Sequence, residues 1–375
     1  MHVAHISFYL DPKKRTPAQI LCDWPTLVDV AEMVRRRGPR VTVVQACNET
    51  NMLTSEGVTY HFLAPTAGQS TIAAQSDFSQ LMSELQADVF HVNGLSFPNE
   101  VIRLRALAPA TPILLQDHAN PVPRFWRRRT HRRAMSAAAG VAFCSLQQAQ
   151  PFIDAGLISP HTRLFEIAEA SSRFSPGDQG QARAVTGLGG DPALLWVGHL
   201  NDNKDPLTVL DGVSDAVRVL PNLQLWCCFG AAPLMSAVQE RIANDERLRD
   251  RVNLLGWASH TQIEQLMRAA DLFVLGSHRE GSGYSLIEAL ACGLPPVVTD
   301  IASFRSLTGA GAAGALWTCG NAESLTRALI TVAAQPKALA RAAALTQFDK
   351  ALNFDAIGGQ LVAAYQELLA PCAHA

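Results

Sequence analysis

The feature that most constrains the fold is an alternation of short apolar runs with helix-like segments that continues through nearly the whole chain. The first apolar run, 3–9, is followed by a polar loop, an amphipathic segment at 26–37 and another apolar run at 41–44. Short, continuous apolar runs are typical of strands buried on both faces, as in a parallel sheet covered by helices. The pattern therefore predicts an α/β protein with doubly wound, mostly parallel sheets.

A stretch rich in glycine, proline and polar residues divides this alternation into two series. It contains Ser175-Pro-Gly-Asp178 and Gly187-Leu-Gly-Gly-Asp-Pro192. Such stretches commonly connect domains, and 375 residues are too many for one typical core. We therefore expect a first domain at 1–174 and a second at 190–350.

Composition excludes several classes of protein. The formal net charge is −2 and 48% of the residues are hydrophobic, which does not favour nucleic-acid binding or disorder. None of the apolar runs is long enough to cross a bilayer, and the chain opens on a strand-like run. The eight cysteines form no Cys-x-x-Cys pair, which favours reduced thiols over disulfides or a zinc site. We expect a soluble, cytoplasmic protein.

The most informative motif lies between two strand-like runs, 271–275 and 296–299. The loop Glu280-Gly-Ser-Gly-Tyr-Ser285 leads into a predicted helix at 285–291. Glycines let backbone N–H groups approach a ligand closely, and the first turn of a helix attracts anions. The motif therefore predicts a cradle for a phosphate group.

Two acidic residues frame this motif. Glu280 precedes the helix, and Glu288 lies about one turn inside it, where side chains lean back toward the N-terminus. Both carboxylates can therefore face one crevice and accept hydrogen bonds from sugar hydroxyls beside a bound diphosphate. The alternative is two surface glutamates near an ordinary strand-to-helix turn.

The spacing of Glu280 and Glu288, with the run Glu288-Ala-Leu-Ala-Cys-Gly-Leu-Pro295, resembles the E-x7-E signature of glycosyltransferase family 4. Members of that family are retaining enzymes with the GT-B fold, in which two doubly wound, Rossmann-like domains enclose a cleft. The resemblance implies the same fold for this chain.

Further segments extend the resemblance over most of the chain, more closely in the second half than in the first. They are Trp196–Lys204, Val252–Trp257, Gly314–Trp317 and the final helix. The resemblance implies that the second domain binds a nucleotide sugar, that the first domain lies on the acceptor side, and that the C-terminal helix, at about 352–375, packs back on the first domain.

The resemblance also implies roles for individual residues. Lys204 and the backbone N–H groups from Gly283 to Ser285 would hold the diphosphate, and Glu288 would accept the ribose hydroxyls. Glu280 and His118 would act at the donor sugar, His118 from the end of the strand-like run 112–115. The alternatives are a surface lysine and a structural histidine. The full set of implied substrate contacts beside His118 and Glu280 is His199, Lys204, Trp257, Ser282, Gly283, Tyr284, Ser285 and Glu288.

His199 departs from the family pattern, which usually has arginine at this position. Arginine carries a permanent charge, whereas histidine is mostly neutral near neutral pH. If a cationic His199 grips the diphosphate, donor affinity should weaken as the pH rises from about 6 to 8.

The basic run Arg124–Arg133 contains six arginines in ten positions, with Phe125 and Trp126 among them. It is consistent with a solvated helix face. It is also consistent with contact to an anionic membrane surface or to a phosphorylated acceptor.

We therefore expect a retaining glycosyltransferase that moves a sugar from a UDP- or GDP-sugar to a glycan, lipid or small-molecule acceptor. No Asp-x-Asp motif is present, so we expect neither a metal nor a cofactor. The protein would be cytoplasmic, either free or peripheral at the inner face of the membrane. Two alternatives remain: a nucleotide-sugar epimerase of the same fold, and a non-catalytic GT-B protein that binds nucleotide sugars.

Overall fold

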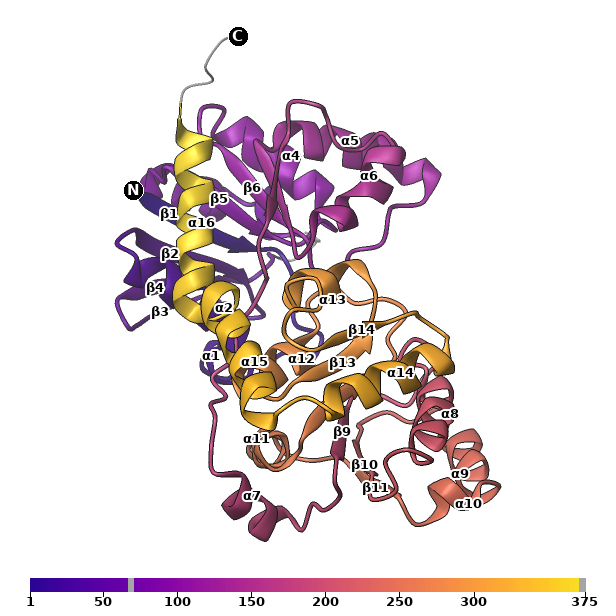
Figure 1. Ribbon diagram of the computed structural model, residues 1–375. Helices are drawn as coiled ribbons and strands as arrows, with labels where there is room; N and C mark the ends of the chain where they lie inside the picture. The colour runs from indigo at the N-terminus through magenta and orange to yellow at the C-terminus, as the bar shows by residue number, and fades with distance from the viewer. Residues whose placement is uncertain (67–70, 371–375) are drawn as a thin grey trace. The chain divides into compact units, whose positions relative to one another are not determined.

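The computed structural model describes residues 1–66 and 71–370, and the chain forms two compact units (Figure 1). Unit 1 comprises Met1–Ala170 and the chain from Phe354 onward, and unit 2 comprises Ser171–Asn353. Each unit is built on a parallel sheet with helices between its strands. The predicted α/β class with two Rossmann-like sheets is confirmed.

The sheet of unit 1 has eight strands in the order β3-β4-β2-β1-β5-β6-β7-β8. All neighbouring pairs are parallel except β3 and β4. Because the chain moves to one side of β1 for β2 and to the other side for β5, the direction of winding switches between β1 and β5. The strands are β1 (His2–Ser7), β2 (Arg40–Ala46), β3 (Asn51–Ser55), β4 (Val58–Leu63), β5 (Val89–Asn93), β6 (Ile113–Gln116), β7 (Gly140–Phe143) and β8 (Arg163–Glu166).

The helices of unit 1 cover this sheet with their apolar faces. Phe78, Val101 and Met135 come from three of these helices and belong to one buried core with the strands. The helices are α1 (Pro17–Asp23), α2 (Pro25–Arg36), α3 (Ser76–Leu85), α4 (Pro98–Leu107), α5 (Arg128–Ala137), α6 (Gln150–Asp154) and α16 (Phe354–Leu369), with the 3-10 turns η1 (Ile72–Ala74), η2 (Phe125–Arg127) and η3 (Leu146–Ala149).

Helix α16 packs against α2 within unit 1 (Figure 1). Gly358 permits this close approach, because a Cβ atom there would lie 2.6 Å from the backbone oxygen of Met33. The buried Tyr365 hydroxyl lies 3.2 Å from His5 Nε2 and 2.7 Å from His91 Nδ1. These polar contacts fix α16 on the sheet, since both histidines stand on central strands.

Three elements of unit 1 were not foreseen. Strand β3 is an exposed, mainly polar edge strand, joined to β4 by a turn in which Glu56 and Gly57 have positive φ. Strand β8 is short and only partly buried. Helix α1 follows the expected polar loop, in a segment for which no helix was predicted. Its Thr16 cap forms a capping box with Gln19, and Pro17 opens the first turn.

The sheet of unit 2 has six parallel strands in the order β11-β10-β9-β12-β13-β14. The winding switches between β9 and β12. Ligands in open α/β sheets bind outside the carboxyl ends of the strands at such a switch point. The strands are β9 (Ala193–Val197), β10 (Gln224–Cys228), β11 (Val252–Gly256), β12 (Leu272–Leu275), β13 (Pro296–Thr299) and β14 (Ala315–Trp317).

The helices of unit 2 begin inside the Gly/Pro-rich stretch around 175–192. Helix α7 lies there, capped by the Asp178 side chain and ended by Gly187 in the left-handed conformation. The helices are α7 (Gln179–Thr186), α8 (Pro206–Ala216), α9 (Met235–Ala243), α10 (Glu246–Arg249), α11 (His260–Ala269), α12 (Tyr284–Ala291), α13 (Ala302–Leu307), α14 (Ala322–Ala333) and α15 (Lys337–Ala351).

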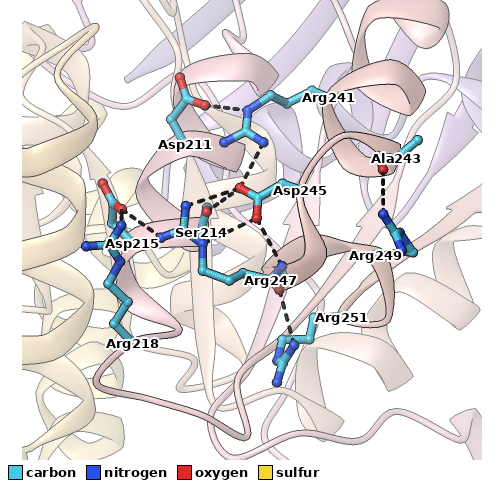
Figure 2. Close-up of polar contacts among 10 residues, drawn as sticks. All are labelled: Asp211, Ser214, Asp215, Arg218, Arg241, Ala243, Asp245, Arg247, Arg249 and Arg251. Atoms are coloured by element: carbon cyan, nitrogen blue, oxygen red, sulfur yellow. Dashed lines mark hydrogen bonds and ion pairs between the residues drawn. The ribbon is translucent and has the colours of Figure 1, made fainter.

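A polar cluster ties α8, α9 and α10 together (Figure 2). Asp245 accepts a hydrogen bond of 2.6 Å from Ser214 Oγ and pairs with Arg241 at 3.0 Å. Arg247 also pairs with Asp245, and Arg241 pairs with Asp211 at 2.7 Å. Arg241 and Arg247, the arginines that define this cluster, thus have carboxylate partners within the fold.

Candidate functional site

Unit 2 has a cavity of about 380 Å³ at its switch point. Segments that follow β9, β10, β11 and β12 supply most of its wall, so it lies at the carboxyl ends of the strands. Seven of the residues singled out in the sequence line it. They are His199, Lys204, Trp257, Glu280, Tyr284, Ser285 and Glu288.

Lys204 and Glu280 form an ion pair in the cavity wall. Lys204 Nζ lies 2.5 Å from Glu280 Oε1, and the two side chains are 16% and 15% exposed. Lys204 lies just before the start of α8, and Glu280 lies just before α12. The pair places a cation and a carboxylate side by side, one suited to phosphate oxygens and the other to hydroxyl groups.

Glu288 lies in α12 and faces His260, the first residue of α11. Glu288 Oε1 lies 2.9 Å from His260 Nε2. Burial raises the pKa of Glu288, although the histidine acts in the opposite direction. Two glutamates therefore reach one cavity, as the motif predicted, and His260 is a neighbour that sequence reasoning missed.

His199 follows β9 and lies against the backbone of the segment after β10. Its Nδ1 accepts a hydrogen bond of 3.0 Å from the N–H of Ala231. An accepting Nδ1 carries no proton, so the ring in this arrangement is neutral and its proton is on Nε2. A cationic grip on phosphate would first require this hydrogen bond to break.

The start of α12 depends on a glycine. Gly283 has φ +58, and a Cβ atom there would lie 2.9 Å from Phe304 Cε1. Ser285 lines the cavity in the first turn of α12, where backbone N–H groups have no earlier helical carbonyl to bond. Ser282 and Gly283 are buried and do not line the cavity. Their contact with a diphosphate stays a prediction.

Trp257 contributes a large aromatic surface to the cavity. It follows β11, and 77% of its surface is exposed. An exposed indole at the rim of a polar cavity offers a flat face on which a nucleobase can stack.

His118, the remaining residue of the predicted set, lies in unit 1. It lines a separate cavity of about 520 Å³ at the carboxyl ends of β1, β5 and β6. His118 Nδ1 pairs with Glu169, and Nε2 lies 3.3 Å from Asn93 Oδ1. Glu169 was missed because β8, the strand before it, was not recognised.

Within residues 1–66 and 71–370, the structure contains no cluster of three His, Cys, Asp or Glu side chains arranged to hold a metal ion. Across the same described ranges, none of the helices combines the length and apolar character needed to cross a membrane.

The sequence of unit 2 matches a known family. Residues 178–346 match the model of the family described as glycosyl transferases group 1. The match covers most of unit 2 and less than half of the chain. The match contains Lys204, Glu280 and Glu288, and it agrees with the resemblance to glycosyltransferase family 4 drawn from the same residues.

Curated relatives of this chain include two proteins named D-inositol 3-phosphate glycosyltransferase. The protein from Mycolicibacterium smegmatis is 31% identical over 198 residues, which cover 49% of this chain and 43% of the relative. The protein from Segniliparus rotundus is 33% identical over 133 residues, which cover 34% of this chain and 29% of the relative. The chain thus matches less than half the length of these relatives.

Solved structures resemble the chain over almost its whole length. HepE from Anabaena, solved in complex with UDP, has a TM-score of 0.71 and 19% identity, covering 98% of this chain and 100% of that one. Sucrose-phosphate synthase from Thermosynechococcus elongatus has a TM-score of 0.68 and 19% identity, covering 98% and 99%. At this identity the likeness establishes the GT-B fold class.

Proposed function

We propose that the protein is a retaining, metal-independent glycosyltransferase that binds its nucleotide-sugar donor in the cavity of unit 2. One observation carries the proposal: Lys204, Glu280 and Glu288, predicted from the sequence, line a single cavity at the switch point of that sheet. Solved structures of the same fold include complexes with UDP and with UDP-glucose, which supports a uridine nucleotide sugar as the donor.

Each polar group in the cavity has a proposed task. Lys204 and the first-turn N–H groups of α12 bind the diphosphate, and His199 adds a neutral donor through Nε2. Glu288 accepts the ribose hydroxyls, for which it must exchange its contact with His260. Trp257 stacks on the nucleobase, and Glu280 accepts hydroxyls of the donor sugar.

The main catalytic demand is to stabilise the negative charge of the departing nucleoside diphosphate. Fixed N–H groups and an ammonium group meet this demand without reorganising during the reaction. The proposal of metal independence rests on these groups. His118 is the proposed contact to the sugar near its reacting carbon, and Glu169 holds its ring through Nδ1.

Turnover tests the proposal. Wild-type protein is incubated with UDP- and GDP-sugars and a mixed panel of glycans, lipids and polyols, and released nucleoside diphosphate is measured with and without EDTA. We expect release that depends on acceptor, survives EDTA and gives a product with the donor's anomeric configuration. An isomerised sugar without acceptor would instead indicate an epimerase, and donor binding without turnover would indicate a non-catalytic protein.

We also propose that α5 and η2 contact an anionic membrane surface. Phe125 and Trp126 are 76% and 59% exposed, beside the six arginines of 124–133. Within the described part of the chain these arginines form no ion pair with a carboxylate, unlike those of the α8–α10 cluster (Figure 2). Charge and aromatic rings together suit an anionic lipid interface.

Vesicle sedimentation tests this contact. The protein should pellet with vesicles containing phosphatidylglycerol and remain in solution with neutral vesicles. Replacing Phe125 and Trp126 by serine should abolish pelleting, whereas Arg249→Gln in α10 should not. Equal pelleting by wild type and the double variant would contradict the contact.

A further inference from the structure

The cavity of unit 1 is well formed, but none of the sequence motifs indicates which ligand it would bind. It is larger than the cavity of unit 2, at about 520 Å³, and falls within the usual size of small-molecule sites. Segments after β1, β5, β6 and β8 meet there with the start of α2. A site at the carboxyl ends of these strands is well placed to hold a ligand.

Aromatic side chains form one side of this cavity. Tyr9 and Trp24 both line it, with ring centroids 5.8 Å apart and ring planes at 45°. Tyr9 is 49% exposed and Trp24 is partly buried, so part of each ring remains accessible. Phe97 adds a third ring to the wall. Such rings offer apolar faces, while the phenol and indole edges retain polar atoms.

Apart from His5 and the His118–Glu169 pair, the polar part of the wall is uncharged. Amide and hydroxyl groups supply it, and these donate to or accept from hydroxyl groups equally well. They belong to Ser7, Gln45, Asn93, Ser96 and Asn120. Gln45 uses its Nε2 to donate to the backbone oxygens of Tyr9 and Ala46, and its Oε1 is buried.

The charged groups near the cavity do not favour an anion. Burial lowers the pKa of His5 to about 4, so that ring is neutral at physiological pH. His118 is already paired with Glu169. Asp117, next to His118, is a second buried carboxyl, whose pKa is raised to about 6 mainly by burial. In the described part of the chain, neither lysine nor arginine lines the cavity.

Several cations of unit 1 are paired with carboxylates or line another pocket. Arg15 pairs with Asp11 and Asp23. Arg129, Arg132 and Arg133 line a separate open pocket on α5. A phosphate group in the aromatic cavity would therefore meet the Glu169 carboxyl, whose partner in the wall is His118, and neither a lysine nor an arginine of the described residues. Like charges brought together at a binding site are strongly unfavourable.

We propose that the cavity of unit 1 binds an uncharged, hydroxyl-bearing ring, such as a sugar or a cyclic polyol, and rejects its phosphorylated counterpart. The identification of the bound ring as the acceptor rests on the proposed function. The binding of the ring to this cavity does not. The acceptor of this chain would then differ in charge from the inositol 3-phosphate in the name of the curated relatives.

Binding is measured without donor, by saturation-transfer NMR on the full chain at millimolar ligand. The probes are matched pairs: myo-inositol with inositol 3-phosphate, methyl glucoside with glucose 6-phosphate, and methyl mannoside with mannose 6-phosphate. We expect at least one neutral ring to bind, with its phosphorylated partner at least about tenfold weaker. Trp24→Ala should remove the signal, and Trp126→Ala, an exposed tryptophan outside the cavity, should not.

A charge variant separates this selectivity from a general loss of binding. Ser96 lines the cavity and is exposed, so Ser96→Lys places a cation at its edge. The variant should gain affinity for the phosphorylated partner while still binding the neutral ring. A phosphorylated ring that binds wild type as tightly as the neutral one, or a panel in which none of the neutral rings binds, would overturn the inference. Donor binding is measured in a separate titration, so neither of these two results would contradict the proposed function.

Discussion

The two cavities occupy equivalent places in their units but have different chemistry. Each lies at the carboxyl ends of parallel strands beside the point where the winding direction switches. The cavity of unit 2 carries Lys204, Glu280 and Glu288, which suit a charged and hydroxylated ligand. The cavity of unit 1 carries Tyr9 and Trp24 in a nearly uncharged wall. The sheet therefore determines where each cavity lies, and the loops determine the chemistry of its wall.

The largest expected effect concerns the buried carboxyl beside the unit 1 cavity. The pKa of Asp117 is raised from 3.8 to about 6, chiefly by burial. A raised carboxyl pKa gives stability that is fully present below the unfolded value and is lost as the pH rises through the folded value. Asp117→Asn cannot ionise. Between pH 4 and pH 7, its free energy of unfolding should therefore rise by about 2 kcal/mol relative to that of wild type.

Urea unfolding at several pH values measures this gain. Asp349→Asn, an exposed position in α15, serves as the control and should show a pH-independent difference from wild type. A constant difference between Asp117→Asn and wild type from pH 4 to 7 would show that Asp117 ionises as an ordinary surface carboxyl. Asp117 would then lie in a more polar environment than its exposure of 5% indicates.

The two cavities also differ in how far the sequence predicts them. Most of the unit 2 site comes from one contiguous stretch and from short segments after apolar strands, so the motif and the strand pattern located it together. In unit 1 only His118 was foreseen. Glu169 follows a short, half-buried strand with charges at both ends, which lacks an apolar signature. Trp24 follows α1, whose Thr16 and Gln19 capping box was a readable signal.

The second-largest expected effect concerns donor affinity, for which substitutions of Trp257 in unit 2 and Trp24 in unit 1 are compared. Trp257→Ala should weaken binding of nucleotide sugars and nucleoside diphosphates alike by about 1 to 2 kcal/mol, because both carry the base that stacks on the indole. Trp257→Phe should recover part of the loss. Isothermal titration calorimetry measures the donor affinity of both variants. Trp24→Ala should leave the donor affinity unchanged. A donor that binds equally well to Trp257→Ala would place its base elsewhere.

The smallest effect concerns His199. Because Nδ1 accepts from Ala231, the neutral ring already offers Nε2–H to the diphosphate. We therefore expect wild-type donor affinity to vary little between pH 6 and 8, in place of the pH dependence expected from a cationic ring. His199→Arg should tighten donor binding by about 1 kcal/mol through a permanent charge. Affinity that falls with rising pH in wild type but not in His199→Gln would show that the ring binds as a cation.

The central claim is that unit 2 binds a nucleotide sugar through the carboxylates of its motif. Calorimetric titration of UDP-glucose, UDP-galactose and GDP-mannose into wild type, Glu288→Gln and the exposed control Glu323→Gln tests it most directly. We predict sub-millimolar binding of at least one donor to wild type and to Glu323→Gln, weakened about 10- to 100-fold in Glu288→Gln by loss of a charged hydrogen-bond acceptor. Failure of all three donors to bind, or equal binding to Glu288→Gln and wild type, would contradict the claim.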